Sequence, residues 1–167
     1  MAKYSFSNAS WTPVAFADTS TMVANQAGFL QGGAATQRLT ITEVYQGGLA
    51  GASSPTFMCL AYDSTVAVTA ITLGTNGKNA RLDQAGSVQS TLPIPGFSAT
   101  TMPQRAATLH CLQLGYNAFG GIVRWVAAPG WEIGITGLSV NVGEVSHSAF
   151  TGGTPGLMSS HILYESP

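Results

Sequence analysis

Hydrophobic residues recur at every second position in several short runs of the chain, which is the period of a β-strand. The run "QRLTITEVYQ" places Leu39, Ile41 and Tyr45 on one face of such a strand. The run "SPTFMCLAYDS" is apolar on both faces, which is typical of a central strand that is covered on two sides. Apolar residues spaced three and four apart with capping residues are nearly absent, so the pattern gives little support to helices.

This pattern predicts an all-β fold. Twenty glycines and eight prolines separate the apolar runs, and 167 residues suit one domain with a single core. We therefore predict one β domain over residues 1–167, a β-sandwich or a jelly-roll-like barrel, with helix below about a tenth of the chain. Strands are expected near residues 3–8, 36–46, 55–63, 106–115, 120–127, 131–142 and 158–164.

Two segments fall outside the alternation. Residues 64–104 are rich in glycine, threonine and proline, and they are predicted to form a long loop excursion. Residues 1–31 are predicted to form an edge strand followed by an extended arm. The arm carries Trp11 and Phe16, which are candidate anchors in a neighbour's pocket. Trp11 covering one end of its own core is the open alternative; if the arm is the anchor, a chain without residues 1–18 folds but no longer binds.

The segment "NAFGGIVRWVAAPGWEI" predicts a β-hairpin. Pro129 and Gly130 occupy the two central positions of a type II turn, where proline fixes a negative φ and glycine accepts a positive one. The flanking runs "GGIVRWV" and "WEIGIT" would be the two strands, on which Arg124 and Glu132 can pair. Within the strand expected over 131–142, the alternation shifts by one at Gly137, which suggests a β-bulge.

The tryptophans of this segment have two interpretations. Trp125 and Trp131 can pack on each other across the hairpin or cap one end of the core. Alternatively, they form a surface aromatic platform for a sugar or for another subunit. The structural corner is the preferred interpretation, and any exposed part is expected to contact protein.

Charged residues are scarce, at 8% of the chain against roughly 25% in an ordinary soluble domain, and the net charge is −1. We expect much of the surface to face other protein, because the centres of interfaces are depleted in charge. The lysines and arginines are scattered, which argues against nucleic-acid binding. No apolar run approaches the roughly 20 residues of a membrane span, and the N-terminal residues lack the apolar centre of a secretion signal.

The two cysteines, Cys59 and Cys111, sit inside apolar runs that are predicted to be central strands. Both are expected to be free thiols and mostly buried, because a buried cysteine behaves as a small apolar residue and reducing compartments disfavour disulfides.

No set of residues predicts catalysis. The chain has no Gly-x-Ser-x-Gly sequence, and its histidines lack the spacing of metal ligands, since His147 and His161 have no third partner. Glu132 and Glu144 can face each other only if a hairpin aligns them as in glycosidases, and isolated acids near strand ends are usually solvated or paired with arginine. We therefore predict no enzyme, no catalytic residue, no metal and no cofactor.

The C-terminal third resembles a group of small β-rich proteins from tailed-phage genomes. The strings that carry the resemblance are "NAFGGIVRWVAAPGWEI", "GEVSHSAF" and "GTPGLMSSHILYE", preceded by "MPQRAATLHCL". The likeness covers residues 101–165, is weaker over "QRLTITEVYQG" and "CLAYDST", and is slight over the first thirty residues and over 63–103. The strings are structural and contain no active-site signature.

The resemblance implies a virion component, and the role most associated with it is head decoration. Such a protein is made in the host cytoplasm, sits as a homotrimer on the capsid exterior and binds the major capsid protein. Alternatives are a tail, fibre or spike component, a carbohydrate-binding β-sandwich that uses Trp125, Trp131 or Trp11, and an unrecognised hydrolase.

Overall fold

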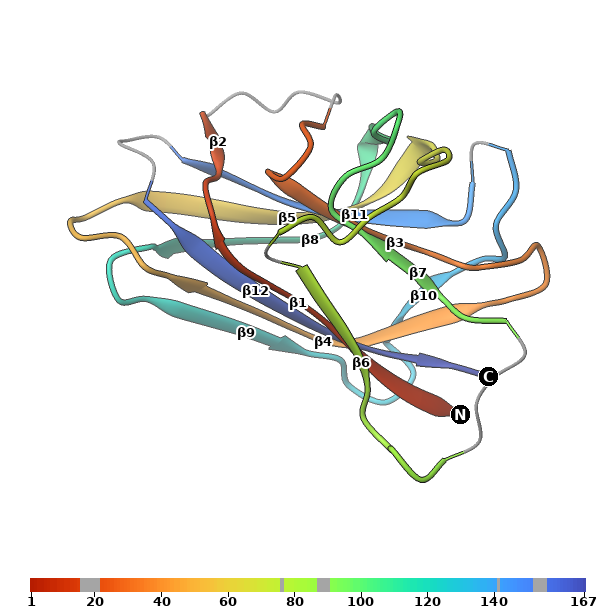
Figure 1. The fold of residues 1–167 in the computed structure, drawn as a ribbon. Coiled ribbons are helices and arrows are strands. Elements are labelled where there is room, and N and C mark those ends of the chain that lie inside the picture. The colour runs from red at the N-terminus through yellow and green to blue at the C-terminus, as the bar shows by residue number, and fades with distance from the viewer. Residues whose placement is uncertain (16–21, 76, 87–90, 141, 152–155) are drawn as a thin grey trace.

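The computed structural model describes residues 1–15, 22–75, 77–86, 91–140, 142–151 and 156–167, which form two β-sheets packed face to face (Figure 1). No helix forms in this part of the chain. The predicted all-β sandwich is confirmed. The barrel alternative is wrong, because each sheet keeps two separate edge strands and does not close on itself.

The first sheet has the order β10-β4-β12-β1-β6, and β9 pairs with the same side of β4 as β10 does. All of its pairings are antiparallel, and β12, the last strand, lies between β4 and β1. Its strands are β1 (Ala2–Trp11), β4 (Leu39–Gly48), β6 (Gly77–Arg81), β9 (Ile122–Val126), β10 (Ile133–Ile135) and β12 (Met158–Ser166).

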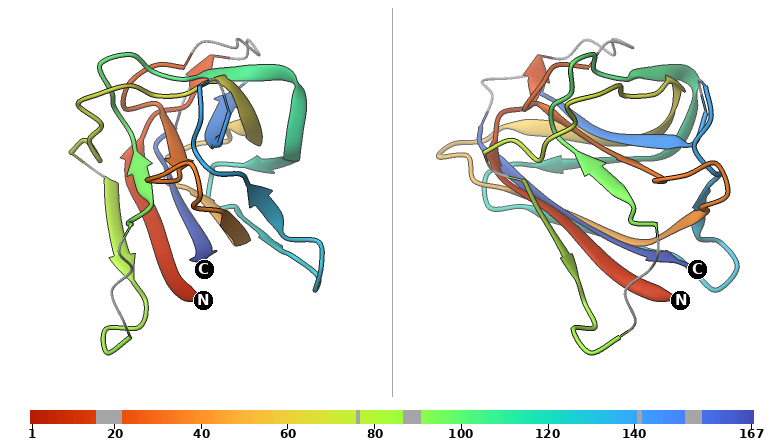
Figure 2. Two further views of the ribbon diagram at one scale, coloured as in Figure 1. Left: turned by 90° about the vertical axis from the view of Figure 1, so that its right-hand side faces the viewer. Right: turned by 45° about the vertical axis from the view of Figure 1, so that its right-hand side comes forward.

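The second sheet has the order β7-β3-β11-β5-β8 and is antiparallel except for β2, which runs parallel to β11. Figure 2 shows the two sheets from two further sides. Its strands are β2 (Val14–Ala15), β3 (Ala27–Gln31), β5 (Pro55–Thr65), β7 (Ile94–Gly96), β8 (Gln104–Asn117) and β11 (Glu144–Thr151).

The core lies between the sheets and follows the period of two. In β12 every second residue from Met158 to Ser166 is buried and each residue between them is partly exposed. Ile162 and Tyr164 of this strand join Phe6 of β1 and Leu60 of β5 in one hydrophobic cluster. Burial of each such side chain contributes about 1.5–3 kcal/mol, which makes this cluster the main source of stability.

A smaller apolar cluster covers the outer face of the second sheet. Cys59, Ala61 and Phe150 are buried there, and the guanidinium of Arg105 lies over the Phe150 ring at 4.7 Å. Cys59 and Cys111 are both free, as predicted. Cys59 is buried, but Cys111 is only half-buried, because β8 is an edge strand and not the central strand that its sequence suggested.

The N-terminal residues form a central strand and not an edge. β1 pairs with β12 on one side and with β6 on the other, and the ring of Tyr4 stacks on that of Tyr164 at 5.4 Å. The register of β1 shifts between Asn8 and Trp11, where Ser10 has a φ of 56°. This irregularity explains the broken alternation, and the arm predicted over residues 1–31 is wrong for the described residues of β1 and β3.

The segment 64–104 is not a loop throughout, as the sequence suggested. It supplies β6 to the first sheet and β7 to the second, and each of these is an edge strand of its sheet. Proline and glycine within "IPG" weakened the strand signal of β7, which pairs with β3 over three residues.

The hairpin predicted around Gly130 is wrong, but its turn is right. Trp131 N–H donates to the carbonyl of Ala128 at 2.9 Å, and Gly130 has a φ of 84°, as a type II turn requires. However, the strands on the two sides of the turn do not pair with each other. β9 and β10 both pair with β4, so the turn belongs to a loop that leaves one edge of the sheet and returns to it.

The strand expected over 131–142 is shorter than predicted, since β10 ends at Ile135. A Cβ at Gly137 would collide with the backbone of Ala35, so this glycine permits a close approach of two chain segments. The change of phase at Gly137 therefore marks the end of the strand region and not a β-bulge.

Candidate interaction surface

The structure places Trp11 in the core. Trp11 is 2% exposed and makes edge-to-face contacts with Phe97 and His147, each at 5.9 Å between ring centroids. This position agrees with the alternative in which Trp11 covers its own core, and it removes the indole from the surface. Phe16 lies outside the described residues.

The other two tryptophans differ from each other. Trp125 lies on β9, faces inward and packs against the core cluster, which leaves it half-buried. Trp131 follows the type II turn and is 79% exposed. Among the described tryptophans, Trp131 is thus the one candidate anchor whose indole is largely exposed to solvent. The sequence feature that indicates an exposed position is the turn sequence Pro129-Gly130 directly before it.

Several large apolar side chains are exposed besides Trp131, and two groups of them lie close together at the ends of strands. Val140 and Val142 lie near the loop that follows β10. The second group lies at the opposite ends of β4, β8 and β9, and its members are Leu49, Phe119, Ile122 and Leu157. Exposed apolar groups of this kind are typical of surfaces that bind other protein.

Two ion pairs lie on the outer face of the first sheet, Lys3 with Glu165 and Arg124 with Glu43. Arg124 forms an ion pair with Glu43 at 2.9 Å, and not with Glu132 as the sequence suggested, because β9 lies beside β4. Hydrogen bonds from Tyr45 and Arg124 lower the pKa of Glu43. The ion pair partly neutralises this part of the outer face, and Lys78 of β6 is an exposed cation on the same sheet.

A polar row crosses that outer face. Tyr45, His161 and Ser7 are direct neighbours on β4, β12 and β1, and the Ser7 hydroxyl and Nδ1 of His161 are 2.6 Å apart. These side chains line a shallow hollow of about 300 Å³ together with Lys78. No local sequence pattern indicates this group, because it depends on the pairing of the first strand with the last.

The serine–histidine pair does not make a nucleophile site. Both edges of β1 around Ser7 are engaged in strand pairing, with β12 and with β6. The described backbone N–H groups beside the hydroxyl are therefore committed to the sheet and do not form an oxyanion hole. The row is best described as a polar surface that can hydrogen bond to a partner.

Two carboxyl groups lie buried under the outer face of the second sheet. Ser146 donates a hydrogen bond to Asp63, and the N–H of Ala67 donates to Glu144 at 3.1 Å. Burial is the largest effect on both groups and raises the pKa of each, and the proximity of the two acids raises that of Glu144 further. Glu132 is exposed in a loop, so the carboxyl pair of this chain is Asp63 with Glu144.

This carboxyl pair lies beside a hollow of about 320 Å³ that Tyr62 and Leu109 also line. Arg105, which is the neighbour of Asp63 in the ladder between β5 and β8, donates to the Ser148 hydroxyl at 2.7 Å. Arg105 also lies close enough to Asp63 to lower the pKa of that carboxyl in part, and the hydrogen bonds of this group link β5, β8 and β11.

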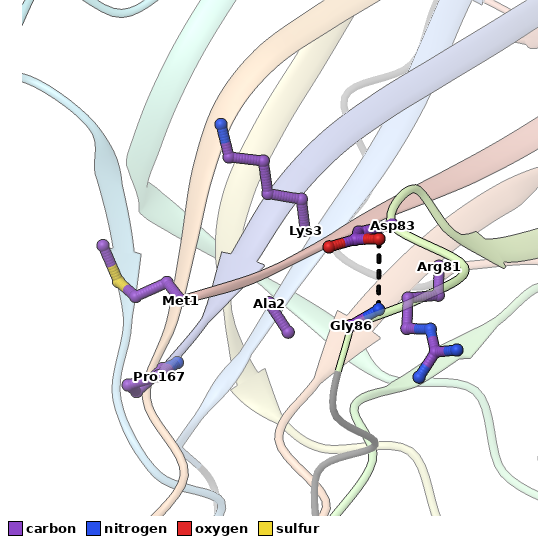
Figure 3. A pocket seen from close by; sticks show the side chains of 7 residues that line it. All are labelled: Met1, Ala2, Lys3, Arg81, Asp83, Gly86 and Pro167. Atoms are coloured by element: carbon purple, nitrogen blue, oxygen red, sulfur yellow. Dashed lines mark hydrogen bonds between the residues drawn. The ribbon is translucent and has the colours of Figure 1, made fainter.

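A larger hollow, of about 450 Å³, lies beside the two chain ends (Figure 3). Figure 3 shows the side chains of Lys3 and Arg81 pointing away from each other. The carboxylate of Asp83 accepts hydrogen bonds from the N–H groups of Ala85 and Gly86 at 3.0 and 3.1 Å, so it serves the local turn. The lining groups do not converge on one point, and the hollow lacks the geometry of a ligand site.

The described part of the chain contains no group of three or more histidine, cysteine, aspartate or glutamate side chains placed to hold a metal ion. None of its described segments is a helix with the length and apolarity needed to cross a membrane.

Comparison with known proteins gives no family. No protein-family model matches the sequence, and no curated protein matches it. Chains from two virus structures overlap with the fold, one of infectious bursal disease virus, Gx strain, and one of mud crab dicistrovirus. The identity is 9% in both cases, and the TM-scores are 0.21 and 0.16.

The overlap covers 98% and 97% of this chain but 41% and 64% of the two viral chains. The chain therefore spans less than two thirds of the length of either one. A likeness at these TM-scores carries no argument about function. The resemblance to tailed-phage virion proteins remains a prediction from the sequence.

Proposed function

We propose that this chain is a structural protein of a virion and, within that class, a head decoration protein of a tailed phage. It binds the major capsid protein from the outside of the shell as a homotrimer and has no catalytic role. The observation that carries the proposal is the surface: large apolar side chains such as Phe119, Ile122 and Trp131 are exposed in a chain with 8% charged residues. The sequence strings over residues 101–165 supply the phage context.

A decoration protein acts by mass action. Each copy adds a small contact area, and many copies together raise the free energy needed to separate neighbouring capsomers. A three-fold assembly fits the local symmetry of a shell and covers part of a surface that has few charges to keep it soluble. A rigid sandwich suits this role, since it binds without a loss of backbone freedom.

A carbohydrate-binding role is the second candidate, and the exposed Trp131 favours it. An indole displayed on a turn can stack against a sugar ring. A glycan array with purified protein and the Trp131→Ala variant separates the two roles. Binding of a glycan that depends on Trp131 supports the second candidate, whereas binding to heads supports decoration.

The experiment for the proposed function uses heads purified without this protein. Purified chain is added, free protein is removed by sedimentation, and occupancy is measured by gel densitometry. Saturable binding to heads, with none to isolated tails, is the expected result. Light scattering is expected to give about three times 17.2 kDa, in solution or after release from heads. Binding to tails alone supports the alternative of a tail, fibre or spike component.

A further inference from the structure

Three chain segments meet at the end of the sandwich that lies on the left in Figure 1. They are the connection from β4 to β5, the turn from β8 to β9, and the residues that lead into β12. We call this end the apolar tip and define it as residues 48–54, 118–122 and 156–157. Backbone hydrogen bonds join the segments: Leu49 N–H to Leu157 at 2.6 Å, Ala50 N–H to Ala118 at 3.0 Å and Gly48 N–H to Gly121 at 3.0 Å.

The apolar tip displays large hydrophobic side chains on a fixed backbone. Its exposed members are between 45% and 77% accessible, although each is large enough to belong in a core. Gly48 lies so close to the backbone of Ala118 that a Cβ would collide with it, and Gly120 has a φ of 67°. The exposed members are Leu49, Phe119, Ile122 and Leu157.

The segments that build the apolar tip carry no charge. The sequence has no lysine, arginine, aspartate or glutamate over residues 44–62, 106–123 and 145–164. The described charges that come next along β4 and β9 are Glu43 and Arg124, which form an ion pair with each other.

The opposite end is different. The chain ends, Lys3, Glu165, Arg81 and Asp83 lie there (Figures 1 and 3). The described charges are therefore unevenly placed along the molecule: the apolar tip has none, whereas the end with the chain ends has several, together with the exposed apolar side chains of Met1 and Leu82. A protein that stands on a surface with one end and faces water with the other has this distribution.

The exposed area of the apolar tip argues against a second copy as its occupant. A large apolar side chain has an accessible surface of about 200 Å² when fully exposed. At the exposed fractions of the four tip side chains, their combined exposed surface is roughly 500 Å². A stable two-partner contact needs roughly 800 Å² on each partner. A contact of this size is sufficient when three copies of one particle bind together, because linked contacts multiply in strength. A lipid surface fits poorly, since such binding usually adds lysine or arginine near the apolar residues.

We propose that the apolar tip is the end of the molecule that docks on the shell, in an uncharged apolar depression on the outer surface of the major capsid protein. This inference deepens the proposed function and rests on it. It also names the end that faces outward, which is the charged end with both chain ends. Phe119 and Ile122 are the anchors, because their side chains are large and their backbone is held by the turn from β8 to β9.

The test introduces a lysine at the tip and, as a matched control, at the other exposed end. The tip variants are Phe119→Lys and Ile122→Lys, and Leu49→Lys is the reserve if either melts below wild type. The control is Val140→Lys, whose side chain is 84% exposed and lies outside the tip. Occupancy is measured on heads purified without the protein, and light scattering reports the mass of each variant.

The expected result is at least a tenfold loss of apparent affinity for heads in the tip variants, with unchanged melting temperature and mass, and wild-type affinity in Val140→Lys. Full binding by the tip variants overturns the inference, and so does a loss confined to Val140→Lys. If the tip variants still bind heads but light scattering shows a changed oligomer mass, the tip forms contacts between copies of the chain. That result also overturns the inference. If wild-type chain fails to bind heads, the proposed function itself falls.

Discussion

Nε2 of His147 and the side-chain oxygen of Gln46 are 2.5 Å apart, and this contact joins the two sheets inside the core. The amide oxygen of Gln46 can only accept, so Nε2 carries the proton. The Gln46 amide in turn donates to the sulfur of Met158 at 3.3 Å. Burial lowers the pKa of His147 to about 4, because a charged imidazole in this place would lose its water.

The buried histidine predicts a loss of stability in acid. Unfolded chain takes up a proton on His147 below pH 6.5, whereas the folded chain does so only near pH 4. The contribution is therefore complete above 6.5 and is lost as the pH falls through 4, at a cost of about 3 kcal/mol. Denaturant unfolding at pH 7 and pH 4 is expected to show a smaller drop in His147→Gln than in wild type. Equal drops would contradict the assignment.

Asp63 and Glu144 predict the opposite dependence at higher pH. Their raised pKa values mean that the folded chain keeps a proton that the unfolded chain releases. Stability from this pair is complete below pH 3.8, the ordinary pKa of aspartate, and is lost as the pH rises through about 7 for Asp63 and about 10 for Glu144. Thermal unfolding between pH 5 and pH 9 is expected to show a flatter profile in Glu144→Gln than in wild type. Glu132→Gln, which changes an exposed acid, is the control and is expected to follow wild type.

A side chain introduced at Gly130 is expected to destabilise the fold by straining the backbone of the turn, and not by colliding with neighbouring atoms. A side chain at this position meets open space, but a φ of 84° is unfavourable for any residue with a Cβ. Gly130→Val is expected to lower the free energy of unfolding by about 1 kcal/mol or more. Gly115→Val is the matched control, since Gly115 also has open space and its φ is not positive. The same melting temperature for both variants would refute the turn.

The two cysteines predict labelling in two steps. Both thiols are free, Cys59 is buried under the second sheet, and Cys111 is half-buried on the edge strand β8. A thiol reagent is expected to label Cys111 within minutes and Cys59 only when the protein opens. Cys111→Ser is expected to remove the fast step. A single slow step for both thiols would show that β8 is covered.

The sequence predicted strands where apolar residues recur along one face or along both. β12 and β5 were found because apolar residues recur along them, and the type II turn was found because proline and glycine fix its geometry. β11 was missed because Ser146, His147 and Ser148 interrupt the apolar pattern, although its residues from Glu144 to Phe150 are buried. Its polar groups are satisfied by partners from β4, β5 and β8, which no local pattern reveals.

The interaction surface was predicted only in part. The preferred interpretation of Trp131 as part of a structural corner is wrong, since its indole is 79% exposed. Trp11 was left open between an anchor and a core residue, and the structure places it in the core, next to the irregularity of β1 at Ser10. The apolar tip could not be predicted, since it depends on three distant segments that meet only in the folded chain. The pairing of β9 with β4 likewise replaced the hairpin that adjacent sequence suggested.

The central position of β1 predicts that the N-terminal residues are required for folding. β1 pairs along both edges and contributes Tyr4, Phe6 and Trp11 to the core. Deletion of residues 1–11 is therefore expected to give an unfolded or aggregated chain, in place of the folded protein that an arm would leave behind. Circular dichroism and proteolysis check this. If the deletion variant unfolds cooperatively near the wild-type melting temperature, the hypothesis that these residues form an arm would be supported again.

Cryo-microscopy of the intact particle whose genome encodes this chain would show where the sandwich binds and which end contacts the shell. We expect density for the sandwich on the outside of the head, around local three-fold positions, with Phe119 and Ile122 against the shell and both chain ends facing outward. Density for the chain in the tail, or none on the head, would contradict the proposed function. Density on the head with the chain ends against the shell would contradict the docking of the apolar tip.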